Sequence, residues 1–327
     1  MHLPPIKLRT QAVPSCPICG SPNSFLAPLI TDLLYHVPGQ WQFRHCVEPH
    51  CGLAWLDPRP IDADIGLAYA SYYTHGGASN KQPNILRQMV QLIQTKALWL
   101  SRSRKTRQRM YLDSLPPGRV LDIGCGGGIT LRLLAKAGWT AVGQEVDPVA
   151  AENARHFSGC DIHLGAIETL GLAAESFDAI TMLHVIEHAS SPVELLSICK
   201  GLLKPGGQLV LVTPNINSLG RHLYGIDWRG LEPPRHLQLF SQAALKTCAE
   251  QSGLQVAHVF TTSAFAAYFS LASQQIRASR LPGETHNYQW IKSMSFKIAS
   301  TMLRTSAEGL GEELVLIAIK MADELPS

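Results

Sequence analysis

The sequence predicts an α/β fold with a doubly wound, mostly parallel sheet, and three observations support this prediction. A short apolar run at 120–123 ends in a glycine-rich turn at 124–128, and helical spacing of apolar residues begins at Ile129. A second apolar run, 139–146, leads into acidic residues. Further apolar runs follow, with room for a helix between neighbours, which is the order expected of strands in a parallel sheet.

The glycine spacing decides what kind of loop follows the first strand. A dinucleotide-binding loop carries glycines at its first, third and sixth positions, but here the sixth position is isoleucine or leucine in either frame. A phosphate-binding P-loop carries a Gly-Lys pair, and no lysine follows these glycines. The remaining pattern is Asp-x-Gly-x-Gly-x-Gly, from Asp122 to Gly128.

This pattern resembles the first motif of class I S-adenosylmethionine-dependent methyltransferases, in which the loop wraps the methionine tail and ribose of the cofactor. The Leu-Lys-Pro-Gly-Gly run at 203–207, a helix end and turn before the fifth strand, recurs in the same family. The resemblance implies a Rossmann-like, seven-stranded sheet. The third, fourth, sixth and seventh strands are expected at 161–164, 176–184, 254–260 and 313–320. The last strand should be antiparallel, after a helical insertion at about 262–310.

The resemblance also implies a set of cofactor contacts. Glu145 lies 23 residues after Asp122, close to the roughly 20-residue offset at which an acid meets ribose hydroxyls. Glu145 should therefore hold both hydroxyls, and the alternative is a solvated acid at a strand end. Asp147 is expected to cap the next helix. Ala166 stands where many relatives carry an acid, so the adenine amine would meet backbone or Glu168. The expected cofactor-binding residues are Asp122, Gly124, Cys125, Gly126, Gly128, Glu145, Val146, Ala166, Ile167 and Leu183.

Four of the eight cysteines are clustered near the N-terminus. Cys16 and Cys19 form a Cys-x-x-Cys turn, and Cys46 and Cys51 supply a second half with four intervening residues. Such a set predicts a structural, tetrahedral Zn²⁺ site with no open position. His45 or His50 could replace a thiolate, and the alternative is four free thiols. The isolated cysteines are expected to be small buried residues: Cys125, Cys160, Cys199 and Cys248.

The domain organisation follows from these segments. We expect a zinc-ribbon-like arm at 1–60, a helical connector at 61–115 and the methyltransferase domain at 116–327. The ribbon, the Asp-Pro-Arg-Pro run at 57–60 and the pair Tyr72 and Tyr73 together resemble a bacterial group linked to sugar and cell-envelope biosynthesis. Tyr72, Tyr73 and His75 would either line the substrate site or pack between arm and core.

Composition limits the functional classes. The net charge of +3 is too small to indicate nucleic-acid binding by itself. No run of about 18 apolar residues predicts a membrane span, and the N-terminus lacks a signal-peptide core, so a cytoplasmic location is expected.

Residues 84–112 predict one long helix or two, with a basic stretch at 84–109. This stretch would contact lipid headgroups, a phosphorylated substrate or RNA, or it would be a solvated face. The oligomeric state is left open.

Two histidine groups are candidates for removing a proton from the acceptor. His184 and His188 flank Glu187 after the fourth strand, at the sheet edge where ligands bind. This run resembles the magnesium-binding Glu-x-x-Glu-His segment of quinone-biosynthesis O-methyltransferases, with His184 in place of the first acid. His236 follows the fifth strand in a Pro-Arg-His turn and is the first candidate for the base. Arg229 and Arg235 would bind an anionic group of the substrate or form surface ion pairs.

The leading functional prediction is methyl transfer to a small-molecule or glycan acceptor in polysaccharide, cell-envelope or secondary metabolism. The alternatives are a quinone-type O-methyltransferase, an RNA or protein methyltransferase that docks its substrate on the ribbon and basic helix, and a cofactor-binding module without catalysis. The sequence shows no Asn-Pro-Pro-Tyr-type tetrapeptide after the fourth strand, which disfavours base-flipping chemistry on RNA.

Overall fold

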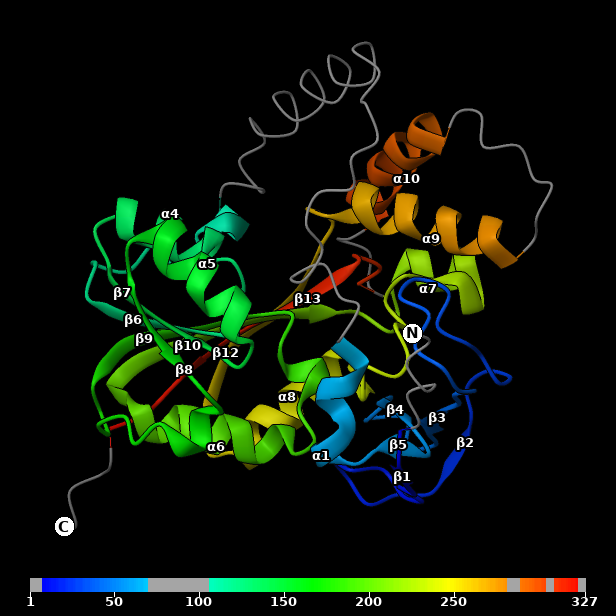
Figure 1. Cartoon of the computed structure of the whole chain (residues 1–327), viewed down its shortest axis with the longest axis horizontal. Coiled ribbons are helices and arrows are strands. Elements are labelled where there is room, and N and C mark those ends of the chain that lie inside the picture. Colours follow the sequence, from blue (N-terminus) through cyan, green and yellow to red (C-terminus); the bar gives the residue numbers. More distant parts are fainter. Residues whose placement is uncertain (1–7, 70–105, 281–288, 304–308, 323–327) are drawn as a thin grey trace, which may run out of the picture.

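The computed structural model describes residues 8–69, 106–280, 289–303 and 309–322. A seven-stranded sheet in the order β12-β13-β10-β9-β6-β7-β8 forms its centre (Figure 1). β13 is antiparallel to both of its neighbours, and the pairs from β10 to β8 are parallel. The strands are β6 (Arg119–Ile123), β7 (Thr140–Glu145), β8 (Asp161–Leu164), β9 (Phe177–Leu183), β10 (Leu203–Pro214), β12 (Gln255–Thr262) and β13 (Glu313–Ile319). The predicted sheet and its antiparallel last strand are confirmed.

The fifth strand begins earlier than the sequence predicts. β10 already pairs with β9 at Leu203, and the register shifts before pairing resumes at Gln208. Gly206 takes a φ of 77° inside this interval. The Pro-Gly-Gly run is therefore an irregularity within a continuous strand, and the turn that was expected to precede the strand lies inside it.

Helices cover both faces of the sheet. In Figure 1, α4 (Ile129–Lys136) and α5 (Pro148–Ser158) lie on one face, and α6 (Pro192–Leu202) and α8 (Gln242–Gln251) lie on the other. Alternate residues of β6 point to opposite faces of the sheet. Val120 packs in the hydrophobic cluster with Leu131 of α4, and Leu121 packs in the cluster with Leu196 of α6. Asp147 caps α5 by accepting hydrogen bonds from two backbone N–H groups, as expected.

The arm forms a small sheet that the core completes. Its order is β11-β4-β3-β2, and β11 belongs to the chain after the fifth strand. Gln238 of β11 pairs with Trp55 of β4, so the arm and the core share one set of strand hydrogen bonds. The arm contains β1 (Thr10–Gln11), β2 (Asn23–Phe25), β3 (Phe43–Cys46), β4 (Ala54–Leu56) and β5 (Arg59–Pro60), followed by α1 (Asp62–Ile65) and η1 (Gly66–Tyr69). The core contributes β11 (Gln238–Leu239), and the short helix η3 (Ile186–His188) follows β9.

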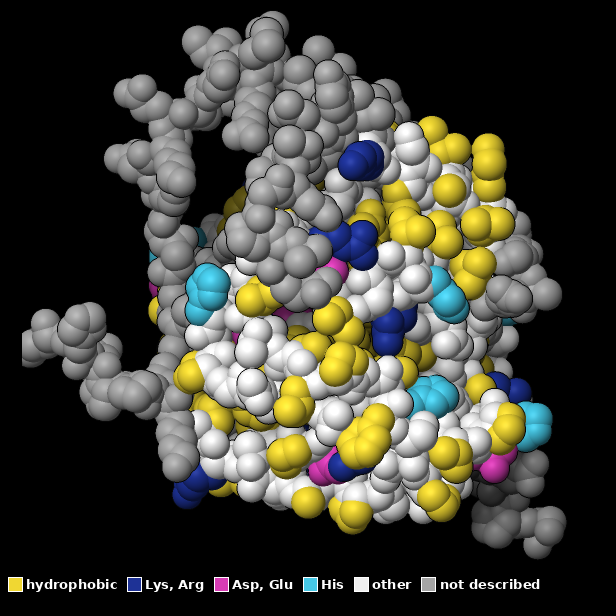
Figure 2. Space-filling view, turned by 90° about the vertical axis from the view of Figure 1, so that its right-hand side faces the viewer, with side chains coloured by type: hydrophobic (Ala, Val, Ile, Leu, Met, Phe, Trp, Pro, Cys, Tyr) yellow, Lys and Arg dark blue, Asp and Glu magenta, His cyan; other side chains and the backbone are white. Residues whose placement is uncertain are grey.

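A helical layer stands beside the end of the sheet where β13 begins (Figure 1). It contains α7 (Leu219–Tyr224), η4 (Gly225–Asp227), α9 (Ala266–Arg280) and α10 (Gln289–Leu303). Of these, α9 and α10 make up most of the described part of the expected helical insertion at about 262–310. Figure 2 shows hydrophobic side chains gathered toward the top of this side of the molecule, at the height of α9 and α10 in Figure 1. Ile298 and Met302 of α10 are exposed.

The helical connector that the sequence predicts at 61–115 is described only at its two ends. Residues 84–105 of the expected basic helix, together with Tyr72, Tyr73 and His75, lie outside the described residues. The expected extension of that helix to residue 112 is wrong, because Met110 and Tyr111 have φ values of 50° and 55° that interrupt helical geometry. Within the described ranges, no helix is long and apolar enough to cross a membrane.

Candidate active site

The glycine loop joins β6 to α4 in the conformation that its sequence requires. Gly124, Gly126 and Gly128 have φ values of 63°, 52° and 77°, which residues with a Cβ adopt at a cost. A Cβ on Gly128 would lie 3.0 Å from the backbone of Ala154 in α5, whereas one on Gly126 would meet open space. Gly128 thus allows close helix packing, and Gly126 keeps the outer side of the loop open for a ligand.

Glu145 ends β7 and holds the glycine loop from the neighbouring strand. Its Oε2 accepts a hydrogen bond from the Gly126 N–H at 2.8 Å, and its Oε1 accepts from Val146 N–H at 2.8 Å and Asp147 N–H at 3.0 Å. A carboxylate has about four lone-pair sites and three are used here, so one acceptor site on Oε2 remains for a ribose hydroxyl. The local backbone orients this side chain before any ligand arrives.

Asp122 lies behind the loop, inside the sheet. Thr181 of β9 donates a hydrogen bond of 2.6 Å to its Oδ1. Burial raises the pKa of Asp122 to about 7, against the effect of the Thr181 hydrogen bond. The carboxyl group therefore joins β6 to β9 just before the loop begins. Sequence reasoning missed Thr181 because the contact depends on strand pairing.

The other expected cofactor residues surround the loop at the ends of neighbouring strands. Val146 is 64% exposed, Ala166 is exposed before the short helix η2 (Ile167–Thr169), and Ile167 is buried. Cys125 is also buried, and Leu183 contributes to the wall of a cavity. Glu168 is exposed on η2. These positions could hold a nucleoside along the carboxyl ends of β6 to β8.

A cavity of about 380 Å³ lies between α4 and the loop that carries His236. Its wall is mainly apolar, with polar groups provided by histidines and by charged side chains that have protein partners. The lining residues include Ile129, Thr130, Leu133, Leu183, His184, His188, Pro214, Arg229, Glu232, His236, Phe265, Tyr268 and Phe269. All three expected catalytic histidines therefore face the same space.

His184 is held between two carboxylates. Its Nδ1 lies 3.0 Å from Glu187 Oε1 and its Nε2 lies 2.8 Å from Glu313 Oε1. Arg107 also pairs with Glu313. Burial lowers the pKa of His184, but hydrogen bonds to Glu187 and Glu313 outweigh this effect and raise it to about 9. Both ring nitrogens of the protonated side chain donate, which leaves no lone pair to accept a proton.

The imidazole rings of His188 and His236 are in contact, and unlike His184 both rings are neutral. His188 Nδ1 is 2.9 Å from both the Arg235 carbonyl oxygen and the Tyr69 hydroxyl oxygen, and His236 Nδ1 is 2.7 Å from the Gly230 carbonyl oxygen. A carbonyl only accepts, so each Nδ1 carries hydrogen and the neutral ring keeps its lone pair on Nε2. Burial lowers the pKa of both side chains. The ring centroids are 4.8 Å apart in an edge-on arrangement.

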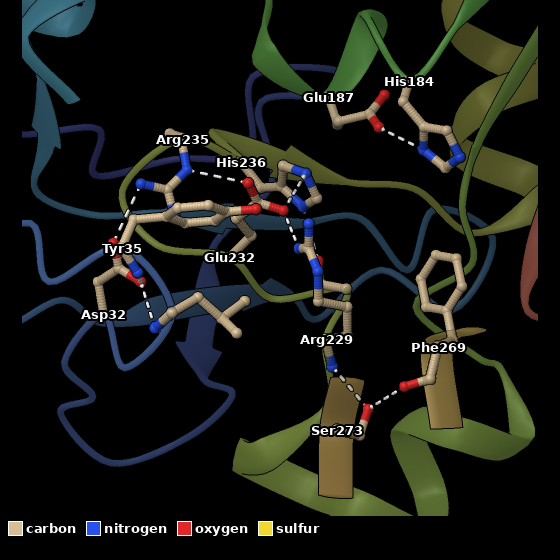
Figure 3. Close-up of polar contacts among 12 residues, drawn as sticks. Asp32, Tyr35, His184, Glu187, Arg229, Glu232, Arg235, His236, Phe269 and Ser273 are labelled. Carbon is tan, nitrogen blue, oxygen red and sulfur yellow. Dashed lines mark hydrogen bonds and ion pairs between the residues drawn. The ribbon is translucent and has the colours of Figure 1, made fainter. Parts of the chain in front are cut away.

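A row of buried charges connects the arm to the cavity (Figure 3). Asp32 of the arm pairs with Arg235 at 3.0 Å, Arg235 pairs with Glu232 at 2.9 Å, and Glu232 pairs with Arg229 at the cavity wall. Arg235 is fully buried and also lies 4.1 Å from the centre of the Tyr35 ring. The alternative of surface ion pairs for these arginines is therefore wrong, because their partners are buried carboxylates of the protein.

The loop is also fixed from the helical layer. The Arg229 N–H donates to Ser273 Oγ of α9 at 2.9 Å, and Ser273 donates to the Phe269 carbonyl oxygen (Figure 3). Sequence reasoning missed Asp32, Glu232 and Ser273. An Arg–Glu spacing of three was visible for Arg229 and Glu232, whereas the contacts from Asp32 and Ser273 arise only in the folded chain.

The four N-terminal cysteines converge as the sequence predicts. One ligand atom of each lies within 4.8 Å of the others, and the sulfur atoms are 3.7 Å apart for Cys16 and Cys51 and 3.4 Å apart for Cys19 and Cys46. Tetrahedral Zn–S bonds of about 2.3 Å require sulfurs roughly 3.8 Å apart, so the cluster fits a zinc ion. Within the described residues, neither His45 nor His50 joins this group.

Comparison with known proteins identifies the family. Residues 96–259 match the family model of a methyltransferase domain, just over half of the 327-residue chain. The chain belongs to this methyltransferase family. A methyltransferase structure of Haemonchus contortus, phosphoethanolamine N-methyltransferase 2 in complex with S-adenosylmethionine, has the same fold, with a TM-score of 0.50 and 14% identity over 87% of this chain and 70% of that chain. The seven-stranded sheet of this chain therefore has the class I methyltransferase fold.

Curated relatives share the methyltransferase core. The ubiquinone biosynthesis O-methyltransferase of Dinoroseobacter shibae is 37% identical over 150 residues, which is 39% of this chain and 60% of that protein. The enzyme of the same name from Cereibacter sphaeroides strain ATCC 17025 is 38% identical over 118 residues, 34% of this chain and 47% of that protein. The chain thus spans about half the length of these curated relatives.

Proposed function

We propose that the protein methylates a hydroxyl oxygen of a small-molecule acceptor that binds in the cavity between α4 and the His236 loop. The observation that carries this proposal is the position of the cavity. One wall is the helix that begins at the glycine loop, and the other carries His188 and His236. A methyl donor at the loop and an acceptor in the cavity would meet at Leu183.

The cofactor would lie along the carboxyl ends of the parallel strands. Glu145 would hold a ribose hydroxyl with the lone pair that remains on Oε2, and the open side of Gly126 would admit the methionine part. The adenine would rest near Ala166 and Ile167, where backbone groups replace the acid found in many relatives. Asp122 would act through the loop, since its carboxyl group is bonded to Thr181 within the sheet.

The reaction would be a displacement at the methyl carbon. The S–CH₃ bond of the sulfonium breaks as the O–CH₃ bond forms, and the hydroxyl proton must leave. His236 remains the first candidate for accepting that proton, because its Nδ1–H donates to Gly230 and leaves Nε2 with a lone pair. His184 would instead orient Glu187, since its two nitrogens donate to Glu187 and Glu313.

The walls of the cavity favour an uncharged acceptor with an apolar body. Leu133, Phe265 and Phe269 line it, and the charges at its edge are balanced by buried partners, as in the Arg229–Glu232 and Arg107–Glu313 pairs. An anionic group would have to break such a pair. The names of the curated relatives support O-methylation of a small molecule. A glycan or cell-envelope acceptor is the competing proposal from the sequence.

Methyl-transfer assays would separate these acceptors. Protein and labelled S-adenosylmethionine would be incubated with hydroxylated aromatic and isoprenoid compounds in one series, and with nucleotide sugars and oligosaccharides in the other. We expect label transfer to the apolar series, lowered about 10²- to 10⁴-fold in His236→Ala if the imidazole is the base. Transfer only to sugars would contradict the proposed acceptor, and full activity of His236→Ala would contradict its catalytic role.

We also propose that the Cys16, Cys19, Cys46 and Cys51 cluster holds a structural zinc ion. Four protein ligands leave no position for substrate, and β11 joins the zinc-bearing sheet directly after His236. The ion would therefore stabilise the arm, whose strand β4 pairs with β11 at the end of the His236 loop.

A further inference from the structure

A second group of metal-ligand side chains lies beside the acceptor cavity. Glu187, His188 and His236 each offer one ligand atom, and these atoms lie within 4.8 Å of one another. Three atoms at the corners of such a triangle are at most about 2.8 Å from its centre. Zinc-type ions bind imidazole nitrogen and carboxylate oxygen at roughly 2.0–2.2 Å, so a small contraction would bring all three into coordination.

The two imidazoles are already oriented as ligands. Each Nδ1 points to a backbone carbonyl, of Arg235 at 2.9 Å and of Gly230 at 2.7 Å. A metal-ligating histidine commonly donates its other ring N–H to a carbonyl or carboxylate, which fixes the tautomer and the ring orientation. The structure therefore provides, for both rings, the outer hydrogen bond that a metal ligand needs.

The carboxylate is held in the same way. Glu187 is fully buried, its Oε1 is 3.0 Å from His184 Nδ1, and its Oε2 accepts a hydrogen bond of 2.9 Å from Thr213. His184 is in turn anchored to Glu313. Each carboxylate oxygen keeps a further lone pair. A buried acid with both oxygens oriented and lone pairs remaining is suited to coordinate an ion.

We propose that Glu187, His188 and His236 bind a divalent transition-metal ion at the edge of the acceptor cavity. Two nitrogen ligands and one oxygen ligand favour ions such as Zn²⁺, Co²⁺ or Fe²⁺ over Mg²⁺, which prefers oxygen. The ligand set differs from a Glu-x-x-Glu-His segment, because His184 stands at the first acid position and donates to Glu187. The third ligand comes from the Pro-Arg-His turn, 48 residues after His188.

The ion would have open positions toward the cavity, because the protein supplies three ligands. Its binding does not depend on the proposed function, but its chemical role rests on it. An acceptor hydroxyl bound to the ion would lose its proton to solvent more easily, and the oxygen would then take the methyl group as the S–CH₃ bond breaks. His236 would in that case act as a ligand that positions the acceptor.

The test is Co²⁺ binding to the full-length protein that retains one zinc per chain. Calorimetry and visible absorption would follow the titration, because cobalt held by nitrogen and oxygen lacks the intense thiolate bands that exchange at the cysteine cluster would produce. We expect one Co²⁺ per chain, bound at least about 100-fold more weakly in His236→Ala and in Glu187→Gln. Glu187→Gln preserves the side-chain size, and thermal melting would show that each variant is folded.

His156→Ala is the matched control, because its side chain is 80% exposed on α5, and Co²⁺ binding should be unchanged. Absence of Co²⁺ binding, unchanged binding in both ligand variants, or equal affinity for Mg²⁺ would each overturn the metal proposal. S-adenosylmethionine binding is measured on the same samples. Cofactor binding without Co²⁺ binding would reject the metal site alone, and Co²⁺ binding without cofactor binding would reject the proposed function alone.

Discussion

The side chains of the candidate site are oriented by hydrogen bonds to residues that are remote in sequence. The type and spacing of residues around the glycine loop predicted a ligand-binding turn and the acid at the end of the next strand. They could not predict that Asp122 bonds to Thr181 or that His184 bonds to Glu313, since these contacts follow from strand pairing. Hydrogen bonding in the fold therefore separates the protonation states of the three candidate histidines, among which the sequence only ranked His236 first.

Glu312 gives a pH-dependent prediction at the residue scale. It is buried, and it accepts hydrogen bonds from Gly220 N–H at 2.7 Å and Trp228 Nε1–H at 3.1 Å. Burial raises its pKa from 4.5 to about 7, so folding favours the neutral form. This contribution to stability is complete below pH 4.5 and is lost as the pH rises through 7. The loss corresponds to about 3 kcal/mol.

Glu312→Gln cannot ionise and isolates this contribution. The free energy of unfolding, measured by urea denaturation from pH 4.5 to 8, should rise in the variant relative to the unchanged protein by about 3 kcal/mol across this range. A difference between the two proteins that stays constant with pH would show that Glu312 does not titrate there.

At the scale of elements, apolar runs and glycines predicted the strands and helices of the core well. The Pro-Gly-Gly run was placed outside β10 because it is typical of turns, yet pairing with β9 continues around it after a register shift. β11 could not be predicted, since two residues carry too little pattern to indicate a strand. Its partner β4 is about 180 residues away in sequence.

The glycine loop yields a prediction with two matched variants. Gly128→Ala should lower the free energy of unfolding by about 2 kcal/mol, because a positive φ and contact with Ala154 act together. Gly126→Ala should cost about 1 kcal/mol, since its Cβ would meet only open space. That space would be occupied by cofactor, so Gly126→Ala should weaken S-adenosylmethionine binding at least about tenfold. Denaturation and calorimetry on both variants would check this, and equal stability losses with intact binding would contradict it.

The contact between the arm and the His236 loop can be tested by removing Asp32. Asp32→Ala leaves the buried Arg235 guanidinium without its carboxylate from the arm, and it also removes the hydrogen bonds that Asp32 accepts from the backbone N–H groups of Leu34, Tyr35 and Val37. We expect these changes together to lower the free energy of unfolding by at least about 3 kcal/mol. Asp113→Ala is the comparison, because its ion pair with Arg109 is on the surface and should contribute less than about 1 kcal/mol. Similar losses of unfolding free energy in both variants would show that the buried ion pairs contribute no more to stability than a surface ion pair does.

For the whole molecule, the arm and the methyltransferase core are built as one unit. The four-stranded sheet takes three strands from the arm and one from the core, and Asp32 reaches the fully buried Arg235. The sequence predicted both parts separately and gave no sign of how they join. The reason is physical: the joining contacts are backbone pairing and buried ion pairs, neither of which has a local sequence pattern.

Metal removal provides a prediction at this scale. If zinc holds the cysteine cluster, a strong chelator should release about one zinc per chain and lower the thermal midpoint of the whole protein, because β11 links the arm to the core. Cys46→Ser should contain no zinc at this site and melt like the chelated protein. Metal analysis and calorimetry would check both, and an unchanged midpoint after zinc release would contradict a structural role.

The central claim is that the glycine loop and Glu145 hold S-adenosylmethionine beside the acceptor cavity. Calorimetric titration of S-adenosylmethionine into the unchanged protein and into Glu145→Ala tests it most directly. We predict micromolar binding to the unchanged protein and a loss of at least about 2 kcal/mol, roughly thirtyfold, in the folded variant. Equal affinity in the two proteins, or no binding to the folded unchanged protein, would contradict this assignment of the site.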